Sequence, residues 1–127
     1  MYSKAVKLNH EKIKRGKVIL QCADFDDCNF QDVTFHCIYF LNVIYFWDDI
    51  HSRLEKIFKL LKPNGKVIIF MADSEVFKDE KQYAGEIIFH LHSIVDVIKV
   101  MGETGFSNIE TKEHTKEKKC YYLTGYK

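Results

Sequence analysis

Two nearly unbroken hydrophobic runs, Phe35–Leu41 and Lys66–Met71, stand out from the more polar remainder of the chain. Strands that are apolar on both faces are typical of a parallel sheet with helices covering it. Between the runs an amphipathic helix is predicted, with its apolar positions at Ile50, Leu54, Ile57, Phe58 and Leu61. Asp48 and Asp49 lie near its positive N-terminal end, and Pro63-Asn64-Gly65 ends it, with the glycine permitting a positive backbone angle. The order strand, helix, strand predicts a right-handed parallel crossover.

The segment before the first run predicts one helix and one strand. Ala5–Arg15 has apolar residues among lysines and is followed by Gly16, which indicates a short surface helix with a glycine stop. Val18–Cys22 predicts a strand that ends at Ala23-Asp24, and the polar residues Asp26–Asp32 predict a turn. This strand would be the first of the five predicted strands in the order of the chain.

The segment after the second run predicts a helix and a strand pair. Ser93 can cap a helix with Asp96 three residues on, and Gly105 ends it. Phe106–Thr111 and Cys120–Tyr126 predict closing strands, joined antiparallel by a charged turn over Lys112–Lys119. We therefore expect an α/β fold, with a mostly parallel sheet flanked by helices and a C-terminal antiparallel strand pair.

Composition narrows the class of protein. The 127 residues suit one domain, and 46% hydrophobic with 29% charged residues is ordinary for a globular chain. The formal net charge of +1 gives no field that would attract nucleic acid or membrane, so neither partner is predicted. No apolar run approaches the roughly 20 residues of a membrane span, and the basic N-terminus lacks a secretory signal. A cytoplasmic location is the default expectation.

Several short motifs follow one another along the chain, and their order and spacing are informative. They are Asn9, Gly16-Lys17-Val18, Asp24, Phe30, Phe35, Asn42, Tyr45-Phe46-Trp47-Asp48, Leu61-Lys62-Pro63-Asn64-Gly65 and Gly105-Phe106. In this order and spacing the chain resembles, from Ala5 onwards, the class I S-adenosylmethionine-dependent methyltransferases of Rossmann-like fold. The Leu-Lys-Pro-Asn-Gly turn after an amphipathic helix is the most specific of the motifs. The resemblance implies a partial Rossmann-like methyltransferase fold, with S-adenosylmethionine as the cofactor.

The resemblance also implies the residues of a cofactor site. Ligands of open parallel sheets collect at the carboxyl ends of strands, where Asp24, Phe25, Asn42 and Val43 are expected. By resemblance, Asp24 accepts a hydrogen bond from the adenine amino group, the Phe25 amide faces the adenine ring, and Asn42 lies near the methionine part. Asp24 has an alternative role as a turn or cap residue, and Asn42 as a turn former at the end of a strand.

Other residue types suggest weaker sites. Tyr45, Phe46 and Trp47 either line the acceptor side of a substrate pocket or pack in the core. His90 and His92 would share one face of a strand, but spacing places no third ligand, so no metal site is predicted. We interpret the remaining candidates as surface histidines and as reduced cysteines without a CxxC pair; they are His10, His51, His114, Cys22, Cys28, Cys37 and Cys120.

The chain departs from the family at its start. Members of the family bind the cofactor with a first strand, a glycine-rich turn and an acidic residue at the end of the second strand. The glycines of this chain form no such glycine-rich group. We therefore expect the C-terminal part of the fold, without the first two strands. His36 stands where the family usually has aspartate, and Asn29 where it usually has proline. These departures argue against cofactor binding by this chain alone.

Without the first strand of the family, one edge of Phe35–Leu41 would be unpaired. We expect either that Val18–Cys22 moves across to fill the gap or that a homo-oligomer or a complementing segment pairs at this edge. Two functions stay open. One is methyl transfer to an acceptor that the sequence does not specify, with the missing half supplied by another segment and no catalytic residue assigned. The other is a non-catalytic remnant that serves as an interaction or oligomerisation module.

Overall fold

A four-stranded mixed sheet forms the body of the protein in a computed structural model, which describes residues 1–30, 35–77, 90–115 and 119–127. The strands are β1 (Phe35–Leu41), β2 (Leu61–Ala72), β3 (Ser107–Thr115) and β4 (Cys120–Tyr126), in the spatial order β1-β2-β4-β3. β1 and β2 are parallel, while β4 runs antiparallel to both β2 and β3. The α/β fold and the antiparallel pair at the C-terminus are confirmed, although only one of the strand pairings is parallel.

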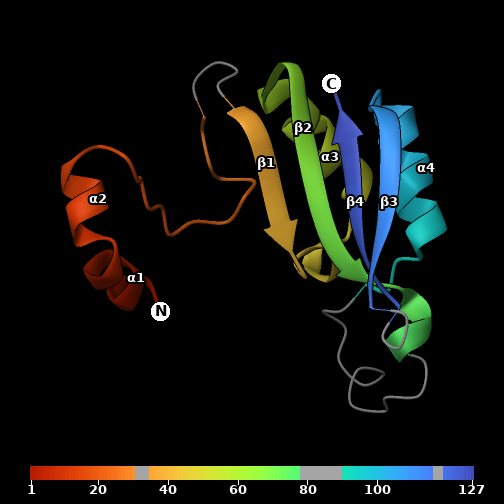
Figure 1. The fold of residues 1–127 in the computed structure, drawn as a ribbon, viewed down its shortest axis with the longest axis horizontal. Helices are drawn as coiled ribbons and strands as arrows, with labels where there is room; N and C mark the ends of the chain where they lie inside the picture. Colours follow the sequence, from red (N-terminus) through yellow and green to blue (C-terminus); the bar gives the residue numbers. More distant parts are fainter. Residues whose placement is uncertain (31–34, 78–89, 116–118) are drawn as a thin grey trace.

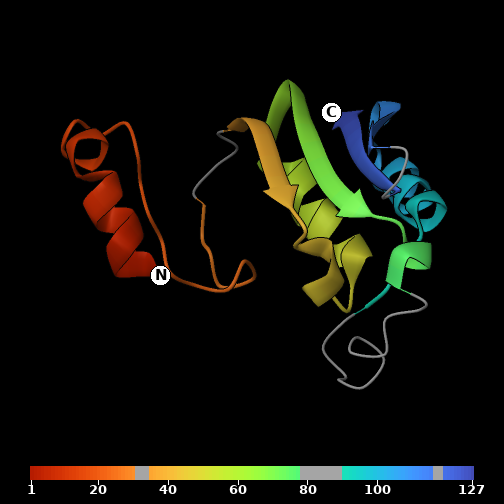
Figure 2. The same cartoon turned by 60° about the horizontal axis from the view of Figure 1, so that its bottom comes forward.

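The two longer helices, α3 (Ile50–Leu60) and α4 (Ile94–Thr104), lie together on one face of the sheet (Figures 1 and 2). Asp49 caps α3, because its carboxylate accepts a hydrogen bond from the Ser52 amide at 3.0 Å. Ser93 caps α4 in the same way through the Asp96 amide, and Gly105 ends it with a φ of 111°. The predicted Ser93 cap and the predicted glycine stop of α4 are confirmed, while Asp49, expected only to lie near the N-terminal end of α3, is found to cap that helix.

The core lies between this face of the sheet and the two helices. Its members from the sheet alternate along the strands, as the period of two requires, and its members from the helices recur at helical spacing. The fully buried ones are Leu54, Ile57, Leu61, Val67, Ile69, Met71, Val97, Met101 and Leu123. The opposite face of the sheet carries no helix in the described part of the chain (Figure 2).

The N-terminal segment differs from its prediction. One helix was expected over Ala5–Arg15, but the chain forms α1 (Tyr2–Leu8) and α2 (His10–Lys14), separated at Asn9. The Asn9 side chain donates a hydrogen bond to the carbonyl oxygen of Ala5 at 3.0 Å, a local bond that competes with continuation of the helix. α1 and α2 contain no buried residue and lie apart from the sheet in Figures 1 and 2.

The strand predicted over Val18–Cys22 is wrong, because these residues are not in a strand. A single strand leaves its amide and carbonyl groups unpaired, and none of the described strands lies in the sheet beside these residues. The expectation that it moves across to pair with β1 is wrong for the same reason, since β1 pairs only with β2 among the described residues. The chain from residue 17 to residue 30 instead contains a turn at Asp24–Cys28.

Two strand boundaries and the conformation of one turn also differ from the prediction. β2 begins at Leu61, which pairs with Phe35, and the Pro63-Asn64-Gly65 turn interrupts the register before Lys66 pairs with Cys37. The positive φ of that turn, 63°, belongs to Asn64, whereas Gly65 was expected to need it. β3 continues beyond Thr111, because Lys112 and Glu113 pair with tyrosines of β4 where a turn was predicted.

After β2 and Asp73 the chain forms the short 3-10 helix η2 (Ser74–Phe77), and residues 78–89 lie outside the described part of the chain. A further 3-10 helix, η1 (Ile44–Phe46), follows β1. None of the described helices combines the length and the hydrophobicity that crossing a bilayer would require.

Candidate functional site

The carboxyl end of β1 carries two of the predicted cofactor residues. Asn42 adopts a left-handed conformation with a φ of 54°, and its amide donates a hydrogen bond to the Phe70 carbonyl oxygen of β2 at 2.9 Å. Asparagine tolerates this conformation better than most residues, which explains its place at the turn out of the strand. Val43 follows, caps η1 and is 37% exposed. Both residues therefore lie where the neighbouring parallel strands end.

The three aromatic residues after this turn have different surroundings. Tyr45 and Trp47 are buried, whereas Phe46 is 55% exposed. The Tyr45 hydroxyl accepts a hydrogen bond from the Ala72 amide at 2.5 Å and donates one to the Ala72 carbonyl oxygen at 3.2 Å. Burial raises the pKa of this phenol, more than the hydrogen bond to Ala72 lowers it. Tyr45 and Trp47 pack in the core, and Phe46 alone of the three faces solvent.

The other two predicted cofactor residues form a turn that packs beside Trp47. The Asp24 carboxylate accepts a hydrogen bond from the Asp26 amide at 3.0 Å. Asp24 therefore stabilises a turn, which is the alternative role that the sequence suggested for it. The Phe25 ring stacks on the Trp47 ring, with centroids 6.1 Å apart and planes inclined by 22°. The contact between these rings joins the Asp24–Cys28 turn to the loop that follows β1.

Two basic residues of α3 fasten this turn, and the sequence analysis did not single out either of them. The Arg53 guanidinium lies 2.7 Å from an Asp26 carboxylate oxygen and 4.0 Å from one of Asp24, and its carbon lies 5.6 Å from the centre of the Trp47 ring. The Lys56 ammonium donates hydrogen bonds to the carbonyl oxygens of Phe25, at 2.6 Å, and Asp26, at 2.9 Å.

A signal for this contact existed in the sequence. Arg53 and Lys56 are three residues apart, which places them on one face of a helix. Asp24, Asp26 and Asp27 form an acidic group that such a face can bind. The pattern did not specify that this group, and no other, is the partner of the basic face, because the two segments lie far apart in the sequence.

The carboxyl end of β2 carries another carboxylate that was not singled out. One oxygen of Asp73 accepts a hydrogen bond from the Ile94 amide at 3.2 Å, and the other accepts one from the Glu75 amide at 3.0 Å. The first bond satisfies an amide at the positive N-terminus of α4. Asp73 thus fixes the start of α4 against the end of β2, at the same edge of the sheet as Asn42.

The predicted histidine pair lies beside the aromatic loop. The His90 and His92 rings have centroids 6.4 Å apart, and the His92 Nε2 atom lies 3.2 Å from the Trp47 carbonyl oxygen. The His90 amide donates a hydrogen bond to the Tyr45 carbonyl oxygen at 2.7 Å. Over the described ranges, no group of three or more histidine, cysteine, aspartate or glutamate side chains is placed to hold a metal ion.

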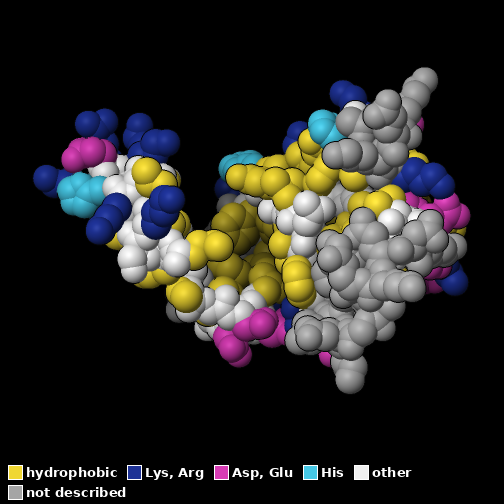
Figure 3. Space-filling model, turned by 90° about the horizontal axis from the view of Figure 1, so that it is seen from below, with side chains coloured by type: hydrophobic (Ala, Val, Ile, Leu, Met, Phe, Trp, Pro, Cys, Tyr) yellow, Lys and Arg dark blue, Asp and Glu magenta, His cyan; other side chains and the backbone are white. Residues whose placement is uncertain are grey.

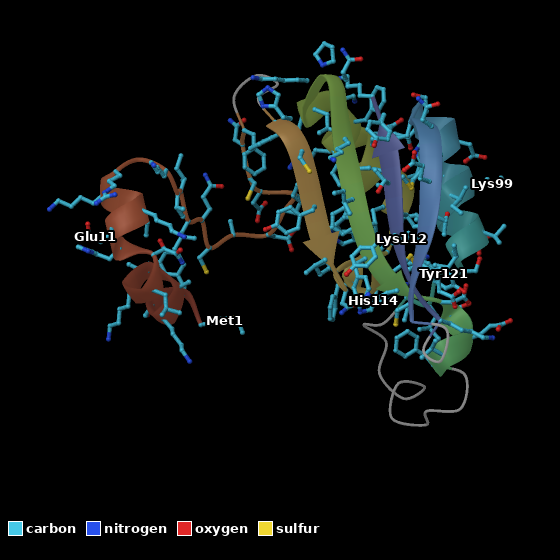
Figure 4. All side chains as sticks on the ribbon, in the orientation of Figure 1. Met1, Glu11, Lys99, Lys112, His114 and Tyr121 are labelled. Atoms are coloured by element: carbon cyan, nitrogen blue, oxygen red, sulfur yellow. The ribbon has the colours of Figure 1, made fainter. Side chains whose placement is uncertain are left out.

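The remaining histidines and the cysteines were interpreted as surface or structural residues. His10 lies 3.5 Å from Glu11, and His51 lies 3.7 Å from Glu55. His114 of β3 lies on the sheet (Figure 4), with its ring centroid 5.6 Å from that of Phe70. The four cysteines form no disulfide; Cys22 and Cys37 are exposed, while Cys28 and Cys120 are half-buried.

The structure therefore places the predicted residues in two connected groups. Asn42 and Val43 lie at the end of β1, Asp24 and Phe25 lie in the fastened turn, and Trp47 contacts Phe25 from the loop after β1. Their cofactor and substrate roles stay predictions. What the arrangement offers chemically is an exposed carboxylate beside packed aromatic rings, next to the carboxyl edge of a parallel strand pair.

Comparison with known proteins assigns this arrangement to a family. Residues 1–69, more than half of the chain, match the family model described as a methyltransferase domain. Phosphoethanolamine N-methyltransferase 2 of Caenorhabditis elegans is 27% identical over 118 residues, which cover 91% of this chain and 27% of that protein. The chain thus spans about a quarter of the length of this curated relative.

Solved structures share the fold. The PH0226 protein of Pyrococcus horikoshii OT3 matches with a TM-score of 0.77 at 15% identity, over 98% of this chain and 66% of that one. Phosphoethanolamine N-methyltransferase 2 of Haemonchus contortus, solved with phosphomonomethylethanolamine and S-adenosylhomocysteine, matches with a TM-score of 0.73 at 23% identity, over 89% of this chain and 27% of that one.

Proposed function

The chain belongs to the methyltransferase domain family, and from this premise we propose that it provides the adenine-binding part of an S-adenosylmethionine site. The cofactor assignment is supported by the structures of relatives that carry S-adenosylmethionine or S-adenosylhomocysteine. Methyl transfer is the corresponding reaction, and in-line positioning of the donor and the acceptor is its main requirement.

One observation carries the proposal. The turn that bears Asp24 is held beside the loop after β1 by Arg53, Lys56 and the Phe25–Trp47 stack. The side chain of Asp24 is 62% exposed, so its carboxylate is accessible to an adenine amino group. Because the turn is fastened, this carboxylate is held in place before a ligand arrives, which lowers the entropic cost of binding.

The roles of the other predicted residues follow from this placement. Asn42 and Val43, at the end of β1, are proposed to face the methionine part of the cofactor. Phe46, which is 55% exposed, is the member of the aromatic loop that can contact an acceptor without rearrangement of the core. Tyr45 and Trp47 support that loop from within the core.

Titration by nuclear magnetic resonance tests the proposal, because it detects binding even when the affinity is weak. Addition of S-adenosylhomocysteine to the 127-residue chain is expected to shift the amide signals of Asp24–Asp26 and Asn42–Trp47. The Asp24→Asn variant is expected to weaken binding at least about tenfold, since a hydrogen bond to a charged group contributes roughly 1.5–3 kcal/mol.

The matched control is Asp27→Asn, which removes the same charge from an exposed position in the same turn. It is expected to leave the affinity within about twofold of the wild type, given the small effect of an exposed charge. Absence of shifts at millimolar ligand, or equal weakening by the two variants, would contradict the role proposed for Asp24.

A second candidate function is a non-catalytic interaction or oligomerisation module. The observation that favours it is the edge of β1, which among the described residues pairs with β2 only and which exposes Tyr39 and Leu41. Exposed hydrophobic strand edges are sites of pairing with other chains. Cofactor titration and sedimentation distinguish the two functions, because each measures one of them without depending on the other.

A further inference from the structure

The N-terminal arm, residues 1–17, carries a charge that the net charge of the whole chain conceals. It contains one acidic residue, Glu11, and six basic residues, which are Lys4, Lys7, Lys12, Lys14, Arg15 and Lys17. The chain has 19 basic and 18 acidic residues, so 13 basic and 17 acidic residues lie outside the arm. The arm therefore has a formal charge of +5, and the remainder of the chain has a formal charge of −4.

The basic side chains of the arm are not neutralised by carboxylates of the same molecule. All six basic residues are exposed, and among the described residues none of them forms an ion pair. The one carboxylate of the arm, that of Glu11, lies 3.5 Å from the His10 ring. Basic side chains crowd the arm in Figure 3, where it projects from the body of the protein. Uncompensated charge of this kind attracts an external anionic partner.

Two kinds of side chain occupy opposite sides of the arm. Spacings of four and seven residues place three hydrophobic residues on one side of a helix, and these are Tyr2, Val6 and Ile13. The same helical period places four basic residues on the other side, and these are Lys4, Lys7, Lys14 and Arg15. The arm is therefore both basic and amphipathic.

The break between α1 and α2 at Asn9 preserves this separation of sides. The Asn9 amide donates a hydrogen bond to the Ala5 carbonyl oxygen at 3.1 Å, and the Ile13 amide donates one to the Asn9 carbonyl oxygen at 2.9 Å. Both bonds have the four-residue spacing of an α-helix, so α2 continues the helical period of α1. The hydrophobic residues of the two helices therefore form one stripe along the arm.

The exposed hydrophobic side chains of the arm indicate which anionic partner it fits. Tyr2 is 47% exposed and Leu8 is 76% exposed, and neither α1 nor α2 contains a buried residue. Nucleic acids are bound chiefly through cations on phosphates and flat rings stacked on bases, so an aliphatic side chain contributes little there. The boundary between the headgroups and the acyl chains of a bilayer accommodates both kinds of side chain. Four to eight basic residues on an amphipathic helix are typical of binding to anionic lipids.

We propose that the N-terminal arm binds the surface of a membrane that contains anionic lipids. The hydrophobic stripe of α1 and α2 lies at the boundary between headgroups and acyl chains, and the lysine side chains extend to the charged headgroups. The remainder of the chain, with its formal charge of −4, is repelled by the same surface, so the arm is the part that makes contact. This association is peripheral, and it depends on neither of the two candidate functions.

Cosedimentation of the 127-residue chain with lipid vesicles tests the proposal. Vesicles of phosphatidylcholine with about 30% phosphatidylserine are expected to bind the chain at least about tenfold more strongly than vesicles of phosphatidylcholine alone. The double variant Lys7→Gln/Lys14→Gln should lose at least about tenfold in binding, since each cation near an anionic surface contributes roughly fivefold. The control is Lys99→Gln/Lys112→Gln, which removes the same charge from exposed positions on α4 and β3 (Figure 4). Equal binding to both kinds of vesicle, or equal loss in both double variants, would overturn the proposal.

A hydrophobic substitution distinguishes a lipid surface from other polyanions. Leu8→Gln keeps every charge and a residue that favours helix, and it should weaken vesicle binding about threefold or more, because it removes a side chain from the boundary region. Val95→Gln on α4 is the matched control, since Val95 is 74% exposed, and it should bind like the wild type. A DNA oligonucleotide is the competing polyanion. Tighter binding to the oligonucleotide than to the vesicles, with no effect of Leu8→Gln on either, would assign the arm to nucleic acid and overturn the proposal.

Discussion

The Tyr45 hydroxyl bridges the amide and the carbonyl oxygen of Ala72, at 2.5 and 3.2 Å, across 27 residues of sequence. This contact joins the loop after β1 to the last residue of β2 inside the core. It therefore fixes the aromatic loop against the carboxyl edge of the sheet, where the candidate site lies. Because both groups of Ala72 use the same hydroxyl, the loss of that oxygen affects two hydrogen bonds at once.

Tyr45→Phe is expected to lower the free energy of unfolding by about 1–3 kcal/mol, since it leaves buried polar groups of Ala72 without this partner. Urea denaturation at neutral pH measures the change. Tyr2→Phe is the matched control, because Tyr2 lies on α1 and is 47% exposed. This variant should change the free energy of unfolding by less than about 0.5 kcal/mol. Equal effects of the two variants would show that the bridge does not stabilise the fold.

The same tyrosine predicts a dependence of stability on alkaline pH. Burial raises the pKa of Tyr45 above its ordinary value of 10.0, so the folded state keeps the phenol proton longer than the unfolded state does. The contribution is fully present below pH of about 10 and decreases as the pH rises above it. Unfolding followed from pH 8 to 11 should therefore show a fall in wild-type stability that is smaller in Tyr45→Phe. Parallel pH curves for the two proteins would refute the assignment.

Position 65 requires glycine because the surrounding backbone leaves no space for a side chain. A Cβ atom there would lie 2.8 Å from the Lys62 carbonyl oxygen and 3.2 Å from the carbonyl oxygens of Phe35 and His36. Gly65→Ala is therefore expected to destabilise the protein by about 1–3 kcal/mol, because backbone atoms of two strands would have to move. Asn64→Gly is the control at the position with positive φ and should change stability by less than about 1 kcal/mol. Thermal unfolding of both variants distinguishes a steric requirement from a conformational one.

The Pro63-Asn64-Gly65 turn also shows what the sequence could predict and what it could not. The local pattern located the turn, because proline, asparagine and glycine together leave few alternatives. It did not show which of the residues takes the positive φ, since that depends on the approach of β1 to Gly65. The same distinction applies to the elements. The spacing of hydrophobic residues located β1, α3, α4 and β4. The prediction of a strand at Val18–Cys22 was wrong, because a strand needs a neighbouring strand with which to pair.

The candidate site follows this rule as well. Asn42 was placed correctly at the end of a strand, because a strand end is a local property of the sequence. The attachment of the Asp24 turn to Arg53 and Lys56 could not be derived, because it joins segments that local patterns describe separately. Charge signs alone allow several partners for a basic helix face, and only the folded chain selects one of them.

The two glycines near the end of α4 predict opposite effects of the same substitution. Gly102 lies inside the helix with nothing within 4 Å of an added Cβ, so Gly102→Ala should stabilise the protein by about 0.5–1 kcal/mol. Gly105 has a φ of 111°, and an added Cβ would lie 3.3 Å from the Phe58 ring. Gly105→Ala should therefore destabilise the protein by about 1 kcal/mol or more. Urea denaturation of the two variants tests where α4 ends. A loss of stability in both variants would contradict the position of the helix end between Gly102 and Gly105.

Arg53 provides the test of the fastened turn, because its guanidinium pairs with Asp26 at 2.7 Å and lies over Trp47. Arg53→Met keeps much of the hydrophobic stem and removes the charge, so it should loosen the turn with a loss of about 1 kcal/mol or less in global stability. Trp47 is the single tryptophan of the chain, so acrylamide quenching of its fluorescence reports the change directly. Quenching should rise in Arg53→Met and stay at the wild-type level in Lys99→Met, whose exposed side chain lies on α4 (Figure 4). If Arg53→Met left the quenching unchanged, the turn would be held by Lys56 and the ring stack without help from the ion pair, and Arg53 would lose its proposed role in positioning Asp24.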